Sequence, residues 1–256
     1  MPANFQSRYG QAAADYLTYR PDYPAEIFER ILAVVPAERR NRAIDLGAGT
    51  GKSTRILAQS FAEVIAVEAD PLMAEQLRAN APSAIVRIAI AEDFACDPAS
   101  ADLVNVATAL RWMDGPRVLE NVARWLRPDG ILAAYGYHPP GTPEPIRSIV
   151  RKEFEDHWNQ HLDPRLLDTN LERGLIQQAR GLRVVGDRQI ANFVPYTAQD
   201  FLGFCRSTSY GSAYARTLAD PESYWRNLES RFRAASGDAK IPVDFNLWFI
   251  LARRDS

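Results

Sequence analysis

The feature that most constrains this chain is a glycine-rich corner at residues 43–53, which read Ala-Ile-Asp-Leu-Gly-Ala-Gly-Thr-Gly-Lys-Ser. A short apolar run ends near Asp45, glycines follow at alternate positions 47, 49 and 51, and a helical pattern begins at Lys52. This order predicts a strand, a turn and a helix. Glycine has no Cβ, so a ligand can lie almost against the main chain of such a turn.

The spacing of the glycines separates three kinds of nucleotide-binding corner. A phosphate-binding loop that ends in Gly51-Lys52-Ser53 requires glycine at position 46, which is Leu. The dinucleotide fingerprint that starts at Gly47 requires glycine at position 52, which is Lys. The remaining pattern, Asp-x-Gly-x-Gly-x-Gly, resembles motif I of class I S-adenosylmethionine (SAM)-dependent methyltransferases. A glycine turn without any ligand is the structural alternative.

A carboxylate follows at the distance that a nucleoside site needs. Residues 62–67 form a second apolar run, which ends in Glu68. An acid about 20 residues beyond the turn, at the tip of the second strand, is placed to accept hydrogen bonds from ribose hydroxyls. A nicotinamide cofactor would use the same acid, so the glycine spacing and not Glu68 favours SAM.

Composition excludes several classes of function. The formal charge of −2 gives no basic footprint for nucleic acid or acidic lipid. Cys96 and Cys205 are far apart and in no metal spacing, and we expect no metal. The sequence shows neither a secretory leader nor an apolar run of membrane-spanning length. We therefore expect a cytoplasmic protein with no nucleic-acid or membrane partner, and the oligomeric state stays open.

Periodicity and breaking residues predict the order of the elements. Helices are expected at 5–20, 25–35, 52–59, 70–80 and 116–126, with Asp70 as the N-cap of the fourth. Strands are expected at 43–46, 62–67, 84–90, 103–107 and 131–137, and a stop at Arg127-Pro-Asp-Gly130. Further helices are expected near 144–160, 164–180, 197–206 and 220–234, and strands at 182–193 and 243–252.

Strands that alternate with helices predict an α/β fold with a doubly wound, mostly parallel, seven-stranded, Rossmann-like sheet that carries helical lid insertions. We expect one domain over 1–256. Its parts would be cofactor-covering helices at 1–40, a cofactor-binding core at 41–137, a helical lid and substrate region at 138–240, and a final strand at 241–256.

Along its whole length the chain resembles a class I methyltransferase, and within that superfamily it is similar to the small-molecule branch that includes trans-aconitate methyltransferases. The residues that carry the resemblance are the segment 16–24 (Tyr-Leu-Thr-Tyr-Arg-Pro-Asp-Tyr-Pro), motif I at 45–51, Glu68, Ala91-Glu92, Ala101-Asp-Leu-Val104, the segment 109–114 (Ala-Leu-Arg-Trp-Met-Asp) and Arg127-Pro-Asp-Gly130.

The resemblance implies a set of cofactor contacts. Ala91 and Glu92 would flank the adenine, Ala107 and Thr108 would face the methionine moiety, and Tyr19 and Arg20 would close over the cofactor. A surface charge beside a proline turn is the alternative for Arg20. The full expected set is Tyr19, Arg20, Asp45, Gly47, Ala48, Gly49, Gly51, Glu68, Ala69, Ala91, Glu92, Ala107 and Thr108.

The acceptor side is less defined. His138 follows the expected fifth strand, where ligand crevices of α/β folds lie, so it is a candidate base or substrate ligand; a capping role at the Pro-Pro hinge is the alternative. Relatives often have His where this chain has Arg111, which favours an anionic substrate. Arg111, Trp112, Tyr137 and Tyr210 are the expected substrate residues. His157 and His161 are four residues apart, but they lack the Glu of a zinc motif.

The sequence thus predicts an enzyme that transfers the methyl group of SAM to a small molecule and leaves S-adenosylhomocysteine. A carboxylate acceptor would need no strong base, whereas a phenol or alcohol would. Two rivals stay open: a protein that binds SAM without methyl transfer, and an NAD(P)-dependent oxidoreductase.

Overall fold

The computed structural model describes residues 13–255, and these divide into two compact units. The sheet unit comprises Asp22–His138, Asp168–Ile190 and residues 247–255. The helical unit comprises residues 13–21, Pro139–Leu167 and Ala191–Asn246. Each unit thus draws on three separate stretches of chain, and each is described by itself.

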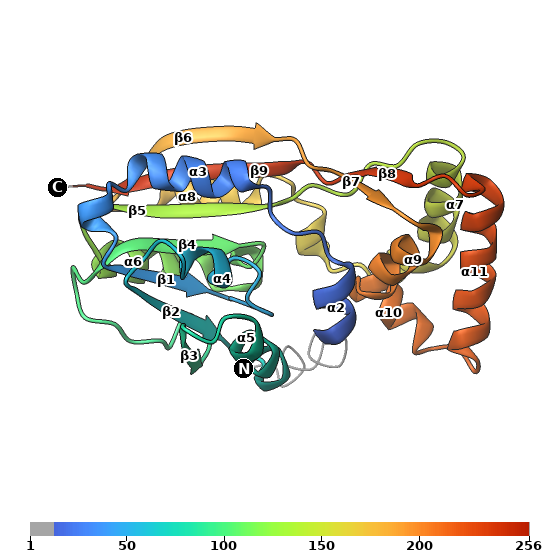
Figure 1. The fold of residues 1–256 in the computed structure, drawn as a ribbon, viewed down its shortest axis with the longest axis horizontal. Helices are drawn as coiled ribbons and strands as arrows, with labels where there is room; N and C mark the ends of the chain where they lie inside the picture. Colours follow the sequence, from blue (N-terminus) through green and yellow to red (C-terminus); the bar gives the residue numbers. More distant parts are fainter. Residues whose placement is uncertain (1–12, 256) are drawn as a thin grey trace. The chain divides into compact units, whose positions relative to one another are not determined.

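The sheet unit is built on a seven-stranded sheet within the described residues, in the order β3-β2-β1-β4-β5-β9-β6 (Figure 1). Neighbours from β3 to β5 are parallel, and β9 is antiparallel to both β5 and β6. The strands are β1 (Arg42–Leu46), β2 (Glu63–Glu68), β3 (Ile85–Ile88), β4 (Ala101–Ala107), β5 (Leu126–Tyr137), β6 (Leu182–Ile190) and β9 (Leu247–Arg254).

The strand order reverses between β1 and β4. From β1 the chain moves outward to β2 and β3, and it then returns to place β4 on the other side of β1. In open α/β sheets ligands bind outside the carboxyl ends of the strands at such a switch point. The glycine turn after β1 and the residues after β4 therefore flank the expected ligand crevice.

Helices cover both faces of this sheet. On one face Leu119 and Trp125 of α6 (Gly115–Trp125) pack with Ile176 of α8 (Leu171–Gln178) in a buried cluster. On the other face α3 (Ala25–Val34) and α4 (Thr54–Leu57) contribute Ile31 and Leu57. The remaining elements of the unit are α5 (Pro71–Asn80) and the single-turn helices η1 (Ala37–Arg39) and η2 (Leu110–Trp112).

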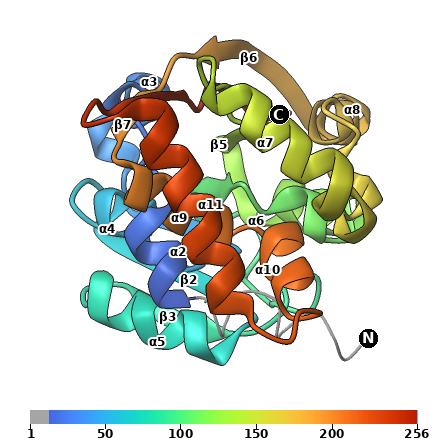
Figure 2. The same ribbon diagram turned by 90° about the vertical axis from the view of Figure 1, so that its right-hand side faces the viewer.

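The helical unit combines helices with a two-stranded antiparallel sheet. Figure 2 shows α2 (Ala13–Tyr19), α9 (Ala198–Arg206) and α11 (Pro221–Ser236) side by side. The strands are β7 (Phe193–Tyr196) and β8 (Ile241–Asp244). The other helical segments are α7 (Ile146–Glu153), the π-helix Phe154–Trp158, η4 (Asn159–His161), η5 (Pro164–Leu166) and α10 (Ser209–Ala215).

The fold class and the seven-stranded sheet are confirmed. The helix expected at 70–80 begins as predicted, because the Asp70 side chain accepts hydrogen bonds from the main-chain N–H groups of Leu72 (2.8 Å) and Met73 (3.3 Å). The helix expected at 5–20 is described only from Ala13 onward, since residues 5–12 lie outside the described part of the chain.

Several boundaries were wrong. The strand expected at 243–252 is two strands in different sheets, which Phe245 and Asn246 separate; the N–H of Asn246 donates to Oδ1 of Asp244 at 2.9 Å. The strand expected at 182–193 ends at Ile190, and β7 follows separately. The helix before the stop expected at 127–130 does end, at Trp125, but β5 begins at Leu126 and includes the stop residues. The helix α10 was not predicted. Among residues 13–255, no helix is long and apolar enough to cross a membrane.

Candidate functional site

The three glycines of the turn after β1 all have left-handed backbone angles, with φ of +63°, +58° and +85°. Two of them are needed for packing. A Cβ on Gly47 would lie 2.5 Å from the Cβ of Ala109, and a Cβ on Gly51 would lie 2.7 Å from Cδ1 of Leu77. Protein atoms already occupy the space beside these two glycines.

Gly49 has a different surrounding. Apart from Gly49 itself and its two neighbours in the chain, no heavy atom of the described residues comes within 4 Å of a Cβ built on it. Its bare main chain therefore faces open space. Gly49 is the glycine of the turn against which a ligand can lie.

The N–H groups of the turn are largely used by the protein. Gly49 donates to Oε2 of Glu68 at 2.7 Å, and Gly51 donates to the carbonyl of Ala48 at 2.9 Å. Ala48 donates to the carbonyl of Val67 at 3.0 Å and packs inward against Ala66 and Leu77, so its methyl group belongs to the core. A phosphate-binding turn instead points several N–H groups at its ligand.

Glu68 lies at the tip of β2 beside Gly49. Its Oε1 accepts a hydrogen bond from the N–H of Asp70 at 2.9 Å. Burial raises the pKa of the Glu68 carboxyl, while the hydrogen bonds from Asp70 and Gly49 act in the opposite direction. Each carboxylate oxygen can accept a second hydrogen bond. Glu68 can therefore bind hydroxyl groups of a ligand without giving up the turn, and Ala69 follows it on the same rim of the sheet.

Asp45 lies beneath the turn, where it is fully buried. Its carboxylate accepts hydrogen bonds from the hydroxyls of Ser53 (2.8 Å) and Thr54 (2.6 Å) and from the side-chain amide of Asn105 (2.8 Å). All three partners are neutral. Burial therefore raises the pKa of Asp45, although the three hydrogen bonds oppose the shift. Asp45 was expected to contact the cofactor, and in this structure it holds β1, β4 and the start of α4 together.

The residues expected at the adenine follow β3. Ala91 is buried, and Oε1 of Glu92 accepts a hydrogen bond from the N–H of Asp114 at 2.6 Å. The carbonyl of Glu92 also accepts a hydrogen bond from the amide of Asn121 at 3.4 Å. Glu92 is thus tied to the beginning of α6.

The end of β4 carries a hydroxyl pair. Thr108, directly after Ala107, has φ of +57°, and its Oγ1 lies 3.0 Å from Oη of Tyr23 in a hydrogen bond. The ring of Tyr23 stacks on Tyr137 with centroids 5.4 Å apart and meets Tyr135 edge-on at 4.9 Å. Tyr23 was not among the expected site residues, although it belongs to the proline-flanked segment that the sequence singled out.

Ion pairs fix the residue before Tyr23. The carboxylate of Asp22 accepts hydrogen bonds from Nζ of Lys52 at 2.9 Å and from Arg55 at 2.7 Å. The pKa of Asp22 is lowered, because these two cations outweigh the effect of its partial burial. The segment that holds Tyr23 is therefore attached to the end of the glycine turn.

Arg111 forms an ion pair within the sheet unit. Its guanidinium donates to both carboxylate oxygens of Glu172, at 2.6 and 2.9 Å, and the Glu172 side chain is only 2% exposed. The positive charge that favoured an anionic substrate is therefore balanced by the protein. Trp112 follows Arg111 in η2 and is partly exposed.

Three expected site residues belong to the helical unit. The ring of Tyr19 lies against Gly203 of α9. Arg20 donates to Oγ (3.0 Å) and to the carbonyl (3.2 Å) of Ser207, and these hydrogen bonds favour the structural alternative for its charge. Tyr210 meets Phe154 edge-on with centroids 6.0 Å apart. The candidate base His138 belongs instead to the sheet unit, where it directly follows β5.

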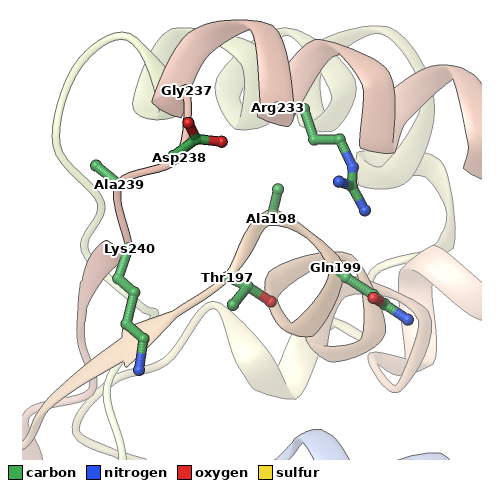
Figure 3. Close-up of a pocket in the computed structure, with 8 residues that line it drawn as sticks. All are labelled: Thr197, Ala198, Gln199, Arg233, Gly237, Asp238, Ala239 and Lys240. Carbon is green, nitrogen blue, oxygen red and sulfur yellow. The ribbon is translucent and has the colours of Figure 1, made fainter.

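Figure 3 shows a pocket within the helical unit that none of the expected site residues lines. It lies between the first residues of α9 and the end of α11. Its lining residues are Thr197, Ala198, Gln199, Arg233, Gly237, Asp238, Ala239 and Lys240.

Within the described residues, no three His, Cys, Asp or Glu side chains gather as a metal site. The ring of His157 stacks on that of Tyr214, with centroids 4.7 Å apart.

Comparisons with known proteins identify the family of the chain. Residues 44–134 match a family described as "Methyltransferase domain". A Dictyostelium discoideum protein described as a methyltransferase is 32% identical over 99% of this chain and 97% of its own length. The chain belongs to the methyltransferase family.

Further relatives and solved structures are similar to parts or to nearly all of this chain. An uncharacterised Mycobacterium tuberculosis methyltransferase is 42% identical over 48% of the chain, and the match spans about half of that relative's length. Trans-aconitate 2-methyltransferase of Methylobacterium radiotolerans is 36% identical over 47% of the chain and 46% of its own. A solved methyltransferase structure from Anaeromyxobacter dehalogenans has a TM-score of 0.68 and 27% identity over 93% of this chain and 97% of that one.

Replacement of Asp45 tests its structural role in this methyltransferase. Asp45→Ala should lower the free energy of unfolding by roughly 2–4 kcal/mol, because it leaves three buried donors without their acceptor. Urea denaturation measures this change. Glu120→Ala, which removes an exposed carboxylate from α6, is the control and should shift it by less than about 0.5 kcal/mol. Equal effects of the two substitutions would contradict the assignment.

Proposed function

We propose that this protein transfers the methyl group of SAM to a small-molecule acceptor. The observation that carries the proposal is made at Gly49. Its main chain faces open space, while its N–H is already donated to Glu68 and is not available to a phosphate. Such a turn suits a nucleoside whose hydroxyls bind a carboxylate. It does not suit a phosphate, which needs free N–H donors and is repelled by acids.

The charges of the site support the same choice of cofactor. Asp45 and Glu68 place two carboxylates at the tips of neighbouring strands, and Asp45 has only neutral hydrogen-bond partners in the structure. Their negative charge favours a sulfonium cation and opposes the pyrophosphate of NAD(P). A protein of the same fold, geranyl diphosphate C-methyltransferase from Streptomyces coelicolor (TM-score 0.51, 14% identity), was crystallised with S-adenosylhomocysteine.

The residues of the chain position the cofactor, which when bound supplies a methyl group already activated by the positive sulfur. Glu68 would accept hydrogen bonds from the ribose hydroxyls, and Gly49 would allow its close approach. Methyl transfer would join a lone pair of the acceptor to the methyl carbon and leave the sulfur with the electron pair of the broken carbon–sulfur bond. Holding the reactants in line can lower the barrier by about 7–11 kcal/mol. A carboxylate acceptor is already deprotonated near neutral pH, so it would require no base from the protein.

The first test is calorimetric titration with S-adenosylhomocysteine, with NADPH and ATP as competing candidates. We expect heat with S-adenosylhomocysteine alone. Gly49→Ala should abolish or strongly weaken this binding, because the added methyl group occupies the open space. The matched control is Gly174→Ala in α8, where no described atom lies within 4 Å and alanine favours the helix. Tight binding of NADPH or ATP without S-adenosylhomocysteine would overturn the proposal.

The affinity for S-adenosylhomocysteine should depend on pH through Glu68. Burial raises the pKa of its carboxyl, so Glu68 takes up a proton at a higher pH than an ordinary glutamate and then loses acceptor capacity. We expect the affinity to be constant near about pH 8 and to fall as the pH is lowered toward about pH 5. Glu68→Gln should bind more weakly and flatten this dependence. Calorimetry across that range would count against the role if both proteins gave the same profile.

The acceptor class is tested by product analysis. Di- and tricarboxylic acids are the first candidates, because a relative is named trans-aconitate 2-methyltransferase. We expect mass spectrometry of reactions with SAM to show a methyl ester, with His138→Ala retaining most of the turnover because a carboxylate needs no base. A product methylated on a phenol or alcohol, with loss of turnover in His138→Ala, would instead favour a base. SAM binding without any product would favour a binding protein.

A further inference from the structure

Tyr23 is held in place from both sides within the sheet unit. Asp22, which precedes it, is bonded to Lys52 and Arg55 beyond the glycine turn. Its own ring stacks on Tyr137 and meets Tyr135 edge-on. Its hydroxyl bonds to Thr108, 85 residues away in the sequence. This ring therefore connects the end of the glycine turn to the ends of β4 and β5.

Thr108 has an uncommon conformation. A β-branched residue in the left-handed region is a steric outlier, and such outliers persist only where their surroundings hold them. Here the Thr108 N–H donates to the carbonyl of Tyr135 at 2.7 Å, and its hydroxyl meets Tyr23. Thr108 directly follows β4, which lies beside β1 at the switch point of the sheet. The strain is thus found where the crevice is expected.

The direction of the hydrogen bond between Tyr23 and Thr108 determines which of the two hydroxyls can donate to a ligand. A phenol is a stronger acid than an alcohol, so Tyr23 is the better donor and Thr108 the better acceptor. If Tyr23 donates, the proton of the Thr108 hydroxyl is left for an acceptor beyond the pair. Thr108 is partly exposed, which allows it to reach a ligand at the tip of β4.

We propose that Tyr23 is a positioning residue that holds the Thr108 hydroxyl as a hydrogen-bond donor to the methionine end of the cofactor. This inference rests on the proposed function. The strained backbone aims the hydroxyl, and the Tyr23 bond fixes its proton direction. Thr108 touches the cofactor, and Tyr23 acts through Thr108.

Calorimetry with S-adenosylhomocysteine and thermal denaturation test the inference without knowledge of the acceptor. Tyr23→Phe and Thr108→Ala should each weaken binding about 3- to 10-fold, the effect of one hydrogen bond. The double variant should bind no more weakly than either single variant, because both remove one shared interaction. Thr108→Ser keeps the hydroxyl and should retain most of the affinity.

Glycine variants separate positioning from stability. Thr108→Gly relieves the left-handed strain, so its denaturation temperature should stay level or rise while its affinity falls like that of Thr108→Ala. The control is Ala99→Gly, before β4, where another non-glycine residue has a positive φ; it should keep wild-type affinity. Tyr214→Phe in α10 controls for loss of a tyrosine hydroxyl.

The outcomes are distinct. Wild-type affinity in both Tyr23→Phe and Thr108→Ala, or losses that multiply in the double variant, would overturn the positioning role while the wild type still binds S-adenosylhomocysteine. Absence of binding by the wild type would overturn the proposed function itself. A lowered denaturation temperature in Tyr23→Phe with unchanged affinity would show that the pair is only structural.

Discussion

The buried carboxylate of Asp45 is the constraint on which the rest of this site depends. Three neutral donors from Ser53, Thr54 and Asn105 converge on it, from the start of α4 and from β4. In the sheet, Asp45 lies directly opposite Asn105. An ionised group in such a place is costly unless its hydrogen bonds are made. These hydrogen bonds join the residues before and after the glycine turn to β4. The backbone of the turn is therefore held in place before any ligand binds.

The glycine turn owes its sequence to two different demands. Gly47 and Gly51 are required by the protein itself, because Ala109 and Leu77 leave no room for a side chain. Gly49 has no such neighbour, and under the proposed function its bare main chain leaves room for the cofactor. The left-handed backbone angles at all three positions add a common cost for any other residue. The glycine motif thus serves two purposes. It allows the loop after β4 to pack against the turn, and under the proposed function it allows the cofactor to approach.

The sequence predicted the features that depend on local chemistry. Asp70 caps its helix through neighbours two and three residues away, and the alternation of strands and helices predicted a doubly wound, mostly parallel, seven-stranded sheet. It did not predict what Asp45 does, because Asn105 is 60 residues distant and meets it only through strand register. The hydrogen bond between Tyr23 and Thr108 was not predicted for the same reason, because the two residues are 85 positions apart in the sequence. Residues 243–252 were predicted as one strand because only Asp244 and Asn246 interrupt an otherwise apolar run.

The charges of the sheet unit favour a sulfonium cofactor mainly because they repel a phosphate-bearing one. Asp45 and Glu68 are acids at the tips of β1 and β2, and Arg111 and Lys52, which could have attracted an anion, are paired with Glu172 and Asp22. A phosphate entering this crevice would lose its water and gain repulsion. A sulfonium nucleoside would gain attraction there and find a carboxylate for its hydroxyls. Under the proposed function, discrimination between the two cofactor classes would arise as much from repulsion as from contact, which is how specificity is commonly achieved.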